Sequence, residues 1–127
     1  MYERSKRVVL VIDGDEEQRV THETILRAEG YATLSAPSGA RALPLLREQP
    51  PGLVLMASKI GPLTPVQLTR VIAGDSALGE VKILVYGAGG DRAMEGEVVK
   101  AGAHRFLVLP VSPQQLVREV VVLIGRP

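Results

Sequence analysis

The segment PPGLVLMASKIGP, residues 50–62, is the strongest clue in the sequence to the architecture of the chain. Its centre holds four consecutive apolar residues, Leu53, Val54, Leu55 and Met56. A short apolar run without polar alternation is typical of a strand buried on both faces, as in parallel sheets. The carboxyl end of such a strand is where α/β proteins usually bind ligands or place reactive side chains. Here that position is Ala57, whose methyl group carries no reactive chemistry.

Short apolar strands alternate with longer helical stretches along the rest of the chain. The predicted strands are residues 7–12, 32–35, 53–57, 82–86 and 105–109. The predicted helices are residues 16–29, 38–49, 64–73, 91–101 and 112–124. This alternation over short loops indicates right-handed crossovers around a parallel sheet. We therefore predict a single doubly wound α/β domain over residues 1–127, with a five-stranded parallel sheet.

Capping residues and one proline refine the helix boundaries. Side chains suited to an N-cap precede four of the helices, namely Asp15, Ser38, Thr64 and Ser112. Pro44 falls inside the helix predicted at 38–49, where proline removes a hydrogen bond and costs about 3 kcal/mol. We expect the regular part of that helix to begin near Leu43.

Composition excludes several classes of function. The chain has 127 residues, a formal net charge of +1 and no cysteine, so disulfides and zinc–thiolate sites are excluded. Neither the charge nor the few aromatic residues favour a nucleic acid or membrane partner. His22 and His104 have no second ligand at metal-binding spacing, and we interpret both as surface or rim residues. The expected location is the cytoplasm.

Four segments resemble the receiver domain of bacterial response regulators, and the resemblance extends over nearly the whole chain. They are VVLVIDGDEEQR (8–19), PGLVLMA (51–57), ILVYGAGGD (83–91) and AGAHRFLVLP (101–110), followed by an amphipathic last helix. The resemblance implies a (βα)5 flavodoxin-like fold. It also implies phosphoryl transfer to an aspartate, assisted by a magnesium ion on two acids, a hydroxyl residue and a lysine.

Most of the residues that this chemistry requires are replaced. The first acid is present as Asp13, whereas the other four positions hold Gly14, Ala57, Gly87 and Leu109. The position of the family's switch aromatic is occupied by Phe106. The resemblance therefore implies a degenerate phosphorylation site, a pseudo-receiver that is no enzyme.

Asp13 and Asp15 are the acidic residues left in this predicted pocket. Magnesium is usually held by one or two carboxylates with further oxygens. Because the acceptor aspartate is missing, we expect no metal and no cofactor, and interpret the two residues as a turn acid and an N-cap. Lys59 either pairs with Asp13 or is solvated. The GAGG turn at 87–90 lacks the lysine of a phosphate-binding loop and is interpreted as a flexible loop.

Two functions from different classes remain. The first is a protein–protein interaction or dimerisation module that acts without phosphorylation, using the fourth helix, last strand and last helix. The candidate residues of that face are Met94, Val98, Arg105, Arg118 and Val122. The alternative is a small-molecule sensor that uses the vacated pocket. Residual phosphotransfer to Ser58 is disfavoured, because its side chain should point to the opposite face from Ala57.

Overall fold

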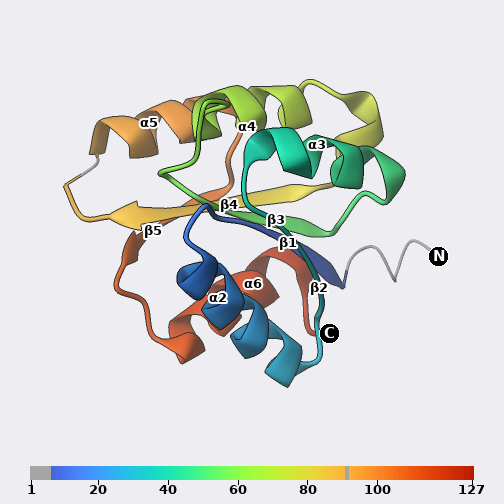
Figure 1. Cartoon of the computed structure of the whole chain (residues 1–127), viewed down its shortest axis with the longest axis vertical. Helices are drawn as coiled ribbons and strands as arrows, with labels where there is room; N and C mark the ends of the chain where they lie inside the picture. Colours follow the sequence, from blue (N-terminus) through green and yellow to red (C-terminus); the bar gives the residue numbers. More distant parts are fainter. Residues whose placement is uncertain (1–6, 91) are drawn as a thin grey trace.

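A computed structural model describes residues 7–90 and 92–127, and it confirms the predicted sheet and helices. The strands are β1 (Val8–Ile12), β2 (Ala32–Ala36), β3 (Leu53–Ala57), β4 (Lys82–Ala88) and β5 (Arg105–Leu109). All pair in parallel, in the order β2-β1-β3-β4-β5. The helices are α2 (Glu16–Glu29), α3 (Gly39–Glu48), α4 (Pro65–Ala73), α5 (Arg92–Ala101) and α6 (Pro113–Ile124), with a short 3-10 turn, η1 (Ser76–Leu78). Helices α3, α4 and α5 cover one face of the sheet, and α2 and α6 cover the other (Figure 1).

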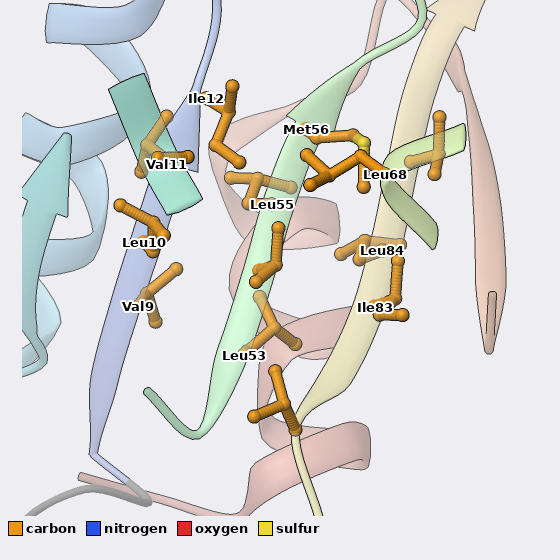
Figure 2. Packing of buried hydrophobic residues seen from close by; sticks show 14 of the residues in the cluster. Val9, Leu10, Val11, Ile12, Leu53, Leu55, Met56, Leu68, Ile83 and Leu84 are labelled. Carbon is orange, nitrogen blue, oxygen red and sulfur yellow. The ribbon is translucent and has the colours of Figure 1, made fainter. Parts of the chain in front are cut away.

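The core lies on both sides of the three central strands. Every residue of β1 and β3 is buried, as the continuous apolar runs predict. Figure 2 shows side chains of β1, β3 and β4 gathered into one cluster, with Leu68 of α4 packed beside Met56. Removal of this apolar surface from water is the main stabilising contribution to the fold.

The helix boundaries confirm the predicted caps and correct one start. Asp15, Ser38, Thr64 and Ser112 each accept a backbone N–H through the side chain. The expected late start near Leu43 is wrong, because α3 begins at Gly39 and runs through Pro44. Both Pro44 and Ala40, whose carbonyl loses its helical partner, are exposed, so water can bind the freed carbonyl. The predicted first residue of α5, Asp91, lies outside the described residues.

Strand β4 runs two residues farther than predicted. It ends at Ala88, so Gly87 lies within the sheet, in register with Val108 of β5. A glycine inside a strand allows close approach of a neighbouring group. The carboxyl ends of the central strands and of β5 therefore meet at one edge, where the predicted site lies.

Candidate functional site

A hollow of about 270 Å³ at the carboxyl edge of the sheet brings the predicted site residues together. Strand β1 leads into Asp13, β3 ends at Ala57, and β4 contributes Gly87. The hollow is bordered by Asp15 and by five of the positions that the resemblance assigns, namely Asp13, Gly14, Ala57, Gly87 and Leu109, whereas Phe106 is not among its lining residues. The strand ends thus gather residues that are far apart in the chain.

The carboxylate of Asp13 is buried and bonded to the protein through both oxygens. Its Oδ2 accepts a hydrogen bond from the hydroxyl of Tyr86, and its Oδ1 accepts the backbone N–H of Asp15 at 2.9 Å. The guanidinium of Arg19 donates to the Asp13 carbonyl oxygen at 2.8 Å. Burial and the hydrogen bond to Asp13 raise the pKa of Tyr86 well above its usual range, so the phenol keeps its proton. Asp13 therefore has its charge stabilised by internal donors.

Tyr86 was not singled out from the sequence, although its place as the one aromatic residue of β4 was a signal. The structure shows that it lies in register with Ala57. Strand β3 lies between β1 and β4, so the Tyr86–Asp13 bond spans the end of β3. The small side chain of Ala57 leaves room there, because residues in register on adjacent strands share a face.

His22 is buried, which corrects its interpretation as a surface or rim residue. Its ring packs edge-on against Tyr86, with ring centroids 4.7 Å apart and an interplanar angle of 86°. Its Nδ1 is buried without a hydrogen-bond partner among the described residues. Burial lowers the pKa of His22, and the charge of Asp13 partly opposes this. The pattern of residues along α2 did not predict this contact, because its second residue, Tyr86, belongs to β4.

Gly87 is packed closely by Ser58 and Phe106. A Cβ on Gly87 would lie 2.3 Å from the Ser58 hydroxyl oxygen and 3.3 Å from Cζ of Phe106. Ser58 is buried, and Phe106 is half-buried. The hydroxyl of Ser58 therefore occupies the space that a side chain at position 87 would need.

Lys59 is exposed and makes no ion pair in the described part of the chain, where no carboxylate lies within 4.0 Å of its ammonium group. The suggested pairing of Lys59 with Asp13 is therefore absent. Asp13 is instead bonded to Tyr86 and to the backbone of Asp15.

Comparison with known proteins assigns the fold to a family. Residues 9–121 match the family described as the response regulator receiver domain. The chain belongs to this receiver domain family. It is 22% identical over 117 residues to the polar-differentiation response regulator DivK of Brucella ovis, covering 92% of this chain and 95% of that protein. These likenesses place the receiver domain in signal transduction.

Solved structures share the fold of this receiver domain. A putative response regulator from Chloroflexus aurantiacus superposes with a TM-score of 0.88 at 26% identity, covering 94% of this chain and 98% of that one. The chemotaxis response regulator CheY4 of Vibrio cholerae gives a TM-score of 0.85 at 20% identity, covering 91% of this chain and 97% of that one. Both comparisons confirm the flavodoxin-like (βα)5 fold predicted from the sequence.

The magnesium ion that the family implies does not fit the residues of this receiver domain. Both oxygens of Asp13 already accept protein hydrogen bonds, and Gly14 and Ala57 offer no carboxylate. One oxygen of Asp15 caps α2. Across residues 7–90 and 92–127, no group of three or more His, Cys, Asp or Glu side chains could hold a metal ion.

The residues of the predicted interaction face lie in different environments in the structure. Val98 is fully buried in the core, so its assignment to a surface is wrong; it lies on the inward stripe of α5. Arg105 is exposed and forms an ion pair with Glu119 of α6 at 2.7 Å. Arg118 and Val122 line a groove between α6 and α2. Met94 is half-buried against the core.

One apolar surface residue of β5 was missed. Val108 is 49% exposed, and the neighbouring Gly89 has no side chain to cover it. We call Met94, Arg105, Val108 and Glu119 the β5 surface.

No helix within the described residues has the length and hydrophobicity needed to cross a lipid bilayer.

Proposed function

We propose that this receiver domain acts without phosphorylation, as a protein–protein interaction or dimerisation module in cytoplasmic signal transduction, with no catalytic activity. The observation that carries the proposal is the hydrogen bond from Tyr86 to Asp13 across the end of β3. It engages the one acid that remains from the family's metal site, directly beside Ala57. An acceptor carboxylate at position 57 and a metal ion on Asp13 would both have to displace this hydrogen bond.

The other residues around the hollow support this proposal. Transfer of a phosphoryl group to an aspartate needs a carboxylate acceptor and donors or cations that stabilise the charge on the phosphoryl oxygens. Gly87 has no hydroxyl, and Leu109 presents an apolar side chain at the position of the family's lysine. Hydrogen bonds to charged groups contribute about 1.5–3 kcal/mol each, so their loss leaves an aspartyl phosphate without stabilisation.

The β5 surface supports the choice of an interaction module. Its exposed Val108 lies on an edge strand, and Arg105 of the same strand forms an ion pair with Glu119 that links β5 to α6. Exposed apolar groups bordered by charges are common at protein interfaces. Phe106 packs against Gly87 behind this surface, so its ring position depends on packing.

Incubation of the full chain with acetyl phosphate and magnesium tests the first part of the proposal. We expect the intact mass to stay unchanged and the amide NMR signals of Gly87 and Phe106 to keep their positions. A stoichiometric gain of one phosphoryl group would overturn the proposal.

A charge introduced at Val108 tests the interaction surface. We expect Val108→Glu to abolish self-association in sedimentation velocity, or retention of a partner on the immobilised chain. Val71→Glu on α4 is the matched control, because Val71 is 38% exposed and α4 contributes no residue to the β5 surface. Equal effects of the two variants would contradict the assignment of the β5 surface.

The hollow itself favours a second candidate function, the sensing of a small polar molecule. Gln18, Ser58 and Lys59 border it with an amide, a hydroxyl and an ammonium group. A ligand at 100 times its Kd would stabilise the fold by about 2.7 kcal/mol, which a thermal-shift screen of metabolites detects. A shift in the wild type that is lost in Lys59→Leu would support this function over the first.

A further inference from the structure

A groove of about 610 Å³ lies between α2 and α6, on the face of the sheet opposite α3, α4 and α5 (Figure 1). Helix α2 contributes Ile25 and Ala28, and α6 contributes Val117 and Val121. These pairs recur at the three- and four-residue spacing that places side chains on one side of a helix. The floor of the groove is therefore aliphatic, and it is separate from the hollow at the strand ends.

The apolar surface continues onto the outer side of α6. Val122 lines the groove and is 65% exposed, the highest value among the large hydrophobic residues of the described chain. On α2, Thr24 and Ala28 are small, so a bulky partner can approach the helix closely. Val20, one turn before Thr24, is 51% exposed and extends the apolar stripe of α2.

The charges around the groove are mostly positive. Arg118 lies in the middle of α6, and Arg126 follows its carboxyl end. Within the described residues, no carboxylate lies within 4.0 Å of either guanidinium. Glu29 is the one acidic residue that lines the groove. Two arginines that have no ion-pair partner among the described residues, beside an apolar floor, complement an apolar surface that carries carboxylates.

We propose that this groove binds an amphipathic helix of a partner protein, with an apolar stripe flanked by acidic side chains. Arg118 lies six residues before the end of α6 at Ile124, roughly 9 Å at helical rise, and Arg126 lies beyond that end, so the acidic residues of the partner stand at least six positions apart. The 12 residues of α6 span roughly 18 Å, which corresponds to about three turns of the partner helix. This goes beyond the proposed function, because it assigns a partner chemistry to a second surface.

Backbone hydrogen bonding favours a helix over an extended segment. Both walls of the groove are side chains of helices, whose backbone groups are already bonded within α2 and α6. A strand placed there would leave its own N–H and C=O groups against aliphatic side chains without partners, which is costly. A helix bonds its backbone internally and presents side chains only.

The test uses a synthetic peptide rather than an unidentified protein. The probe is a fluorescein-labelled peptide of 15 residues, with leucines at helical spacing and two glutamates eight positions apart. Its twin has lysines in place of the glutamates. We expect the full chain, titrated at low salt and followed by fluorescence anisotropy, to bind the acidic peptide about tenfold more tightly than the twin. Amide NMR shifts should change at Thr24, Ala28, Val117 and Val121.

Charge reversal identifies the contact. Arg118→Glu should weaken binding of the acidic peptide about tenfold and strengthen binding of the lysine twin. Arg70→Glu on α4 is the matched control, an exposed arginine on the other face of the sheet, and should leave both affinities unchanged. Melting temperatures of the two variants establish that each is folded.

Other occupants of the groove give different results, and each would overturn the inference. Concentration-dependent dimerisation that Val122→Glu abolishes would assign the groove to a second copy of this chain. Binding of laurate with no binding of the acidic peptide would assign it to an amphiphile. Equal affinity for both peptides, or no effect of Arg118→Glu, would remove the charge argument. Phosphorylation by acetyl phosphate would overturn the proposed function alone and leave this inference standing.

Discussion

The hydroxyl of Tyr86 donates a hydrogen bond to Oδ2 of Asp13, 73 residues earlier in the chain and two strands away in the sheet. The bond crosses the end of β3, where Ala57 lies in register with Tyr86. It joins the one surviving acid of the family site to a side chain that the family pattern does not include. The first two predictions below follow from this contact.

Tyr86→Phe should destabilise the fold by about 1–3 kcal/mol, because Oδ2 of the buried Asp13 loses its donor. Urea unfolding measures the change. Tyr31→Phe is the matched control, since the Tyr31 hydroxyl donates to the carbonyl of Gly125, a neutral acceptor, at 2.5 Å. A neutral hydrogen bond contributes about 0.5–1.5 kcal/mol, so the control should lose less. A larger loss in Tyr31→Phe would contradict the importance of the Asp13 contact.

Ala57→Asp should destabilise the fold without creating a phosphorylation site. The new carboxyl would lie between Asp13 and Tyr86, and a neighbouring carboxylate raises the pKa of a carboxyl group. A folded-state pKa above the unfolded value of about 3.9 means that stability is retained at low pH and lost as the pH rises. Urea unfolding at pH 4 and pH 7 measures this. Ala57→Asn should show no such pH dependence, and equal behaviour of the two variants would refute the prediction.

Gly87→Ala should destabilise the fold by about 1–3 kcal/mol, because its Cβ would meet the Ser58 hydroxyl oxygen at 2.3 Å and Cβ at 2.8 Å. Ser58→Gly removes both atoms and should recover much of the loss in the double variant, as a double-mutant cycle measures. Gly14→Ala is the control, because its nearest neighbour would be 3.5 Å away. Additive effects of Gly87→Ala and Ser58→Gly would show that the two positions are not coupled.

His22 should make the fold less stable in mild acid. Burial lowers its folded-state pKa below the ordinary value of 6.5, so below pH 6.5 the unfolded chain binds more protons. Stability is full above pH 6.5 and is lost as the pH falls towards the folded-state value. His22→Phe, which can keep the edge contact with Tyr86, should flatten this decline in a series of urea unfolding curves. The pKa of His104 is also lowered, by burial and by the charge of Lys82, so His104→Gln should remove a separate part of the decline in stability. An unchanged pH profile in His22→Phe would contradict the buried-histidine argument.

Much of the fold was predictable because its signals are local. The continuous apolar runs of β1 and β3, the capping side chains Asp15 and Ser112, and the alternation of elements all depend on neighbouring residues. The end of β4 was less predictable, because Gly87 breaks local strand preference while pairing with β5 keeps it in the sheet. Pro44 is likewise tolerated inside α3, because both Pro44 and Ala40, whose carbonyl loses its helical partner, are exposed to water.

The position of the candidate site could be predicted from the sequence, but not all of its residues could. Because parallel strands end at one edge, the sequence was sufficient to place Asp13, Ala57, Gly87 and Leu109 together. Tyr86 was not predicted, because a hydrogen bond across β3 depends on strand order and on the empty space above a small side chain.

The remaining features were decided by packing between elements that are distant in the chain. His22 is buried because β4 brings Tyr86 to it, and Val98 is buried while the adjacent Val99 is 50% exposed because of how α5 is rotated against the core. The groove that contains Arg118 and Val122 exists because α2 and α6, at opposite ends of the sequence, cover the same face of the sheet. Periodicity along a chain reports which residues share a face of one helix or strand. It carries no information on which other element that face meets, since long-range contacts set it.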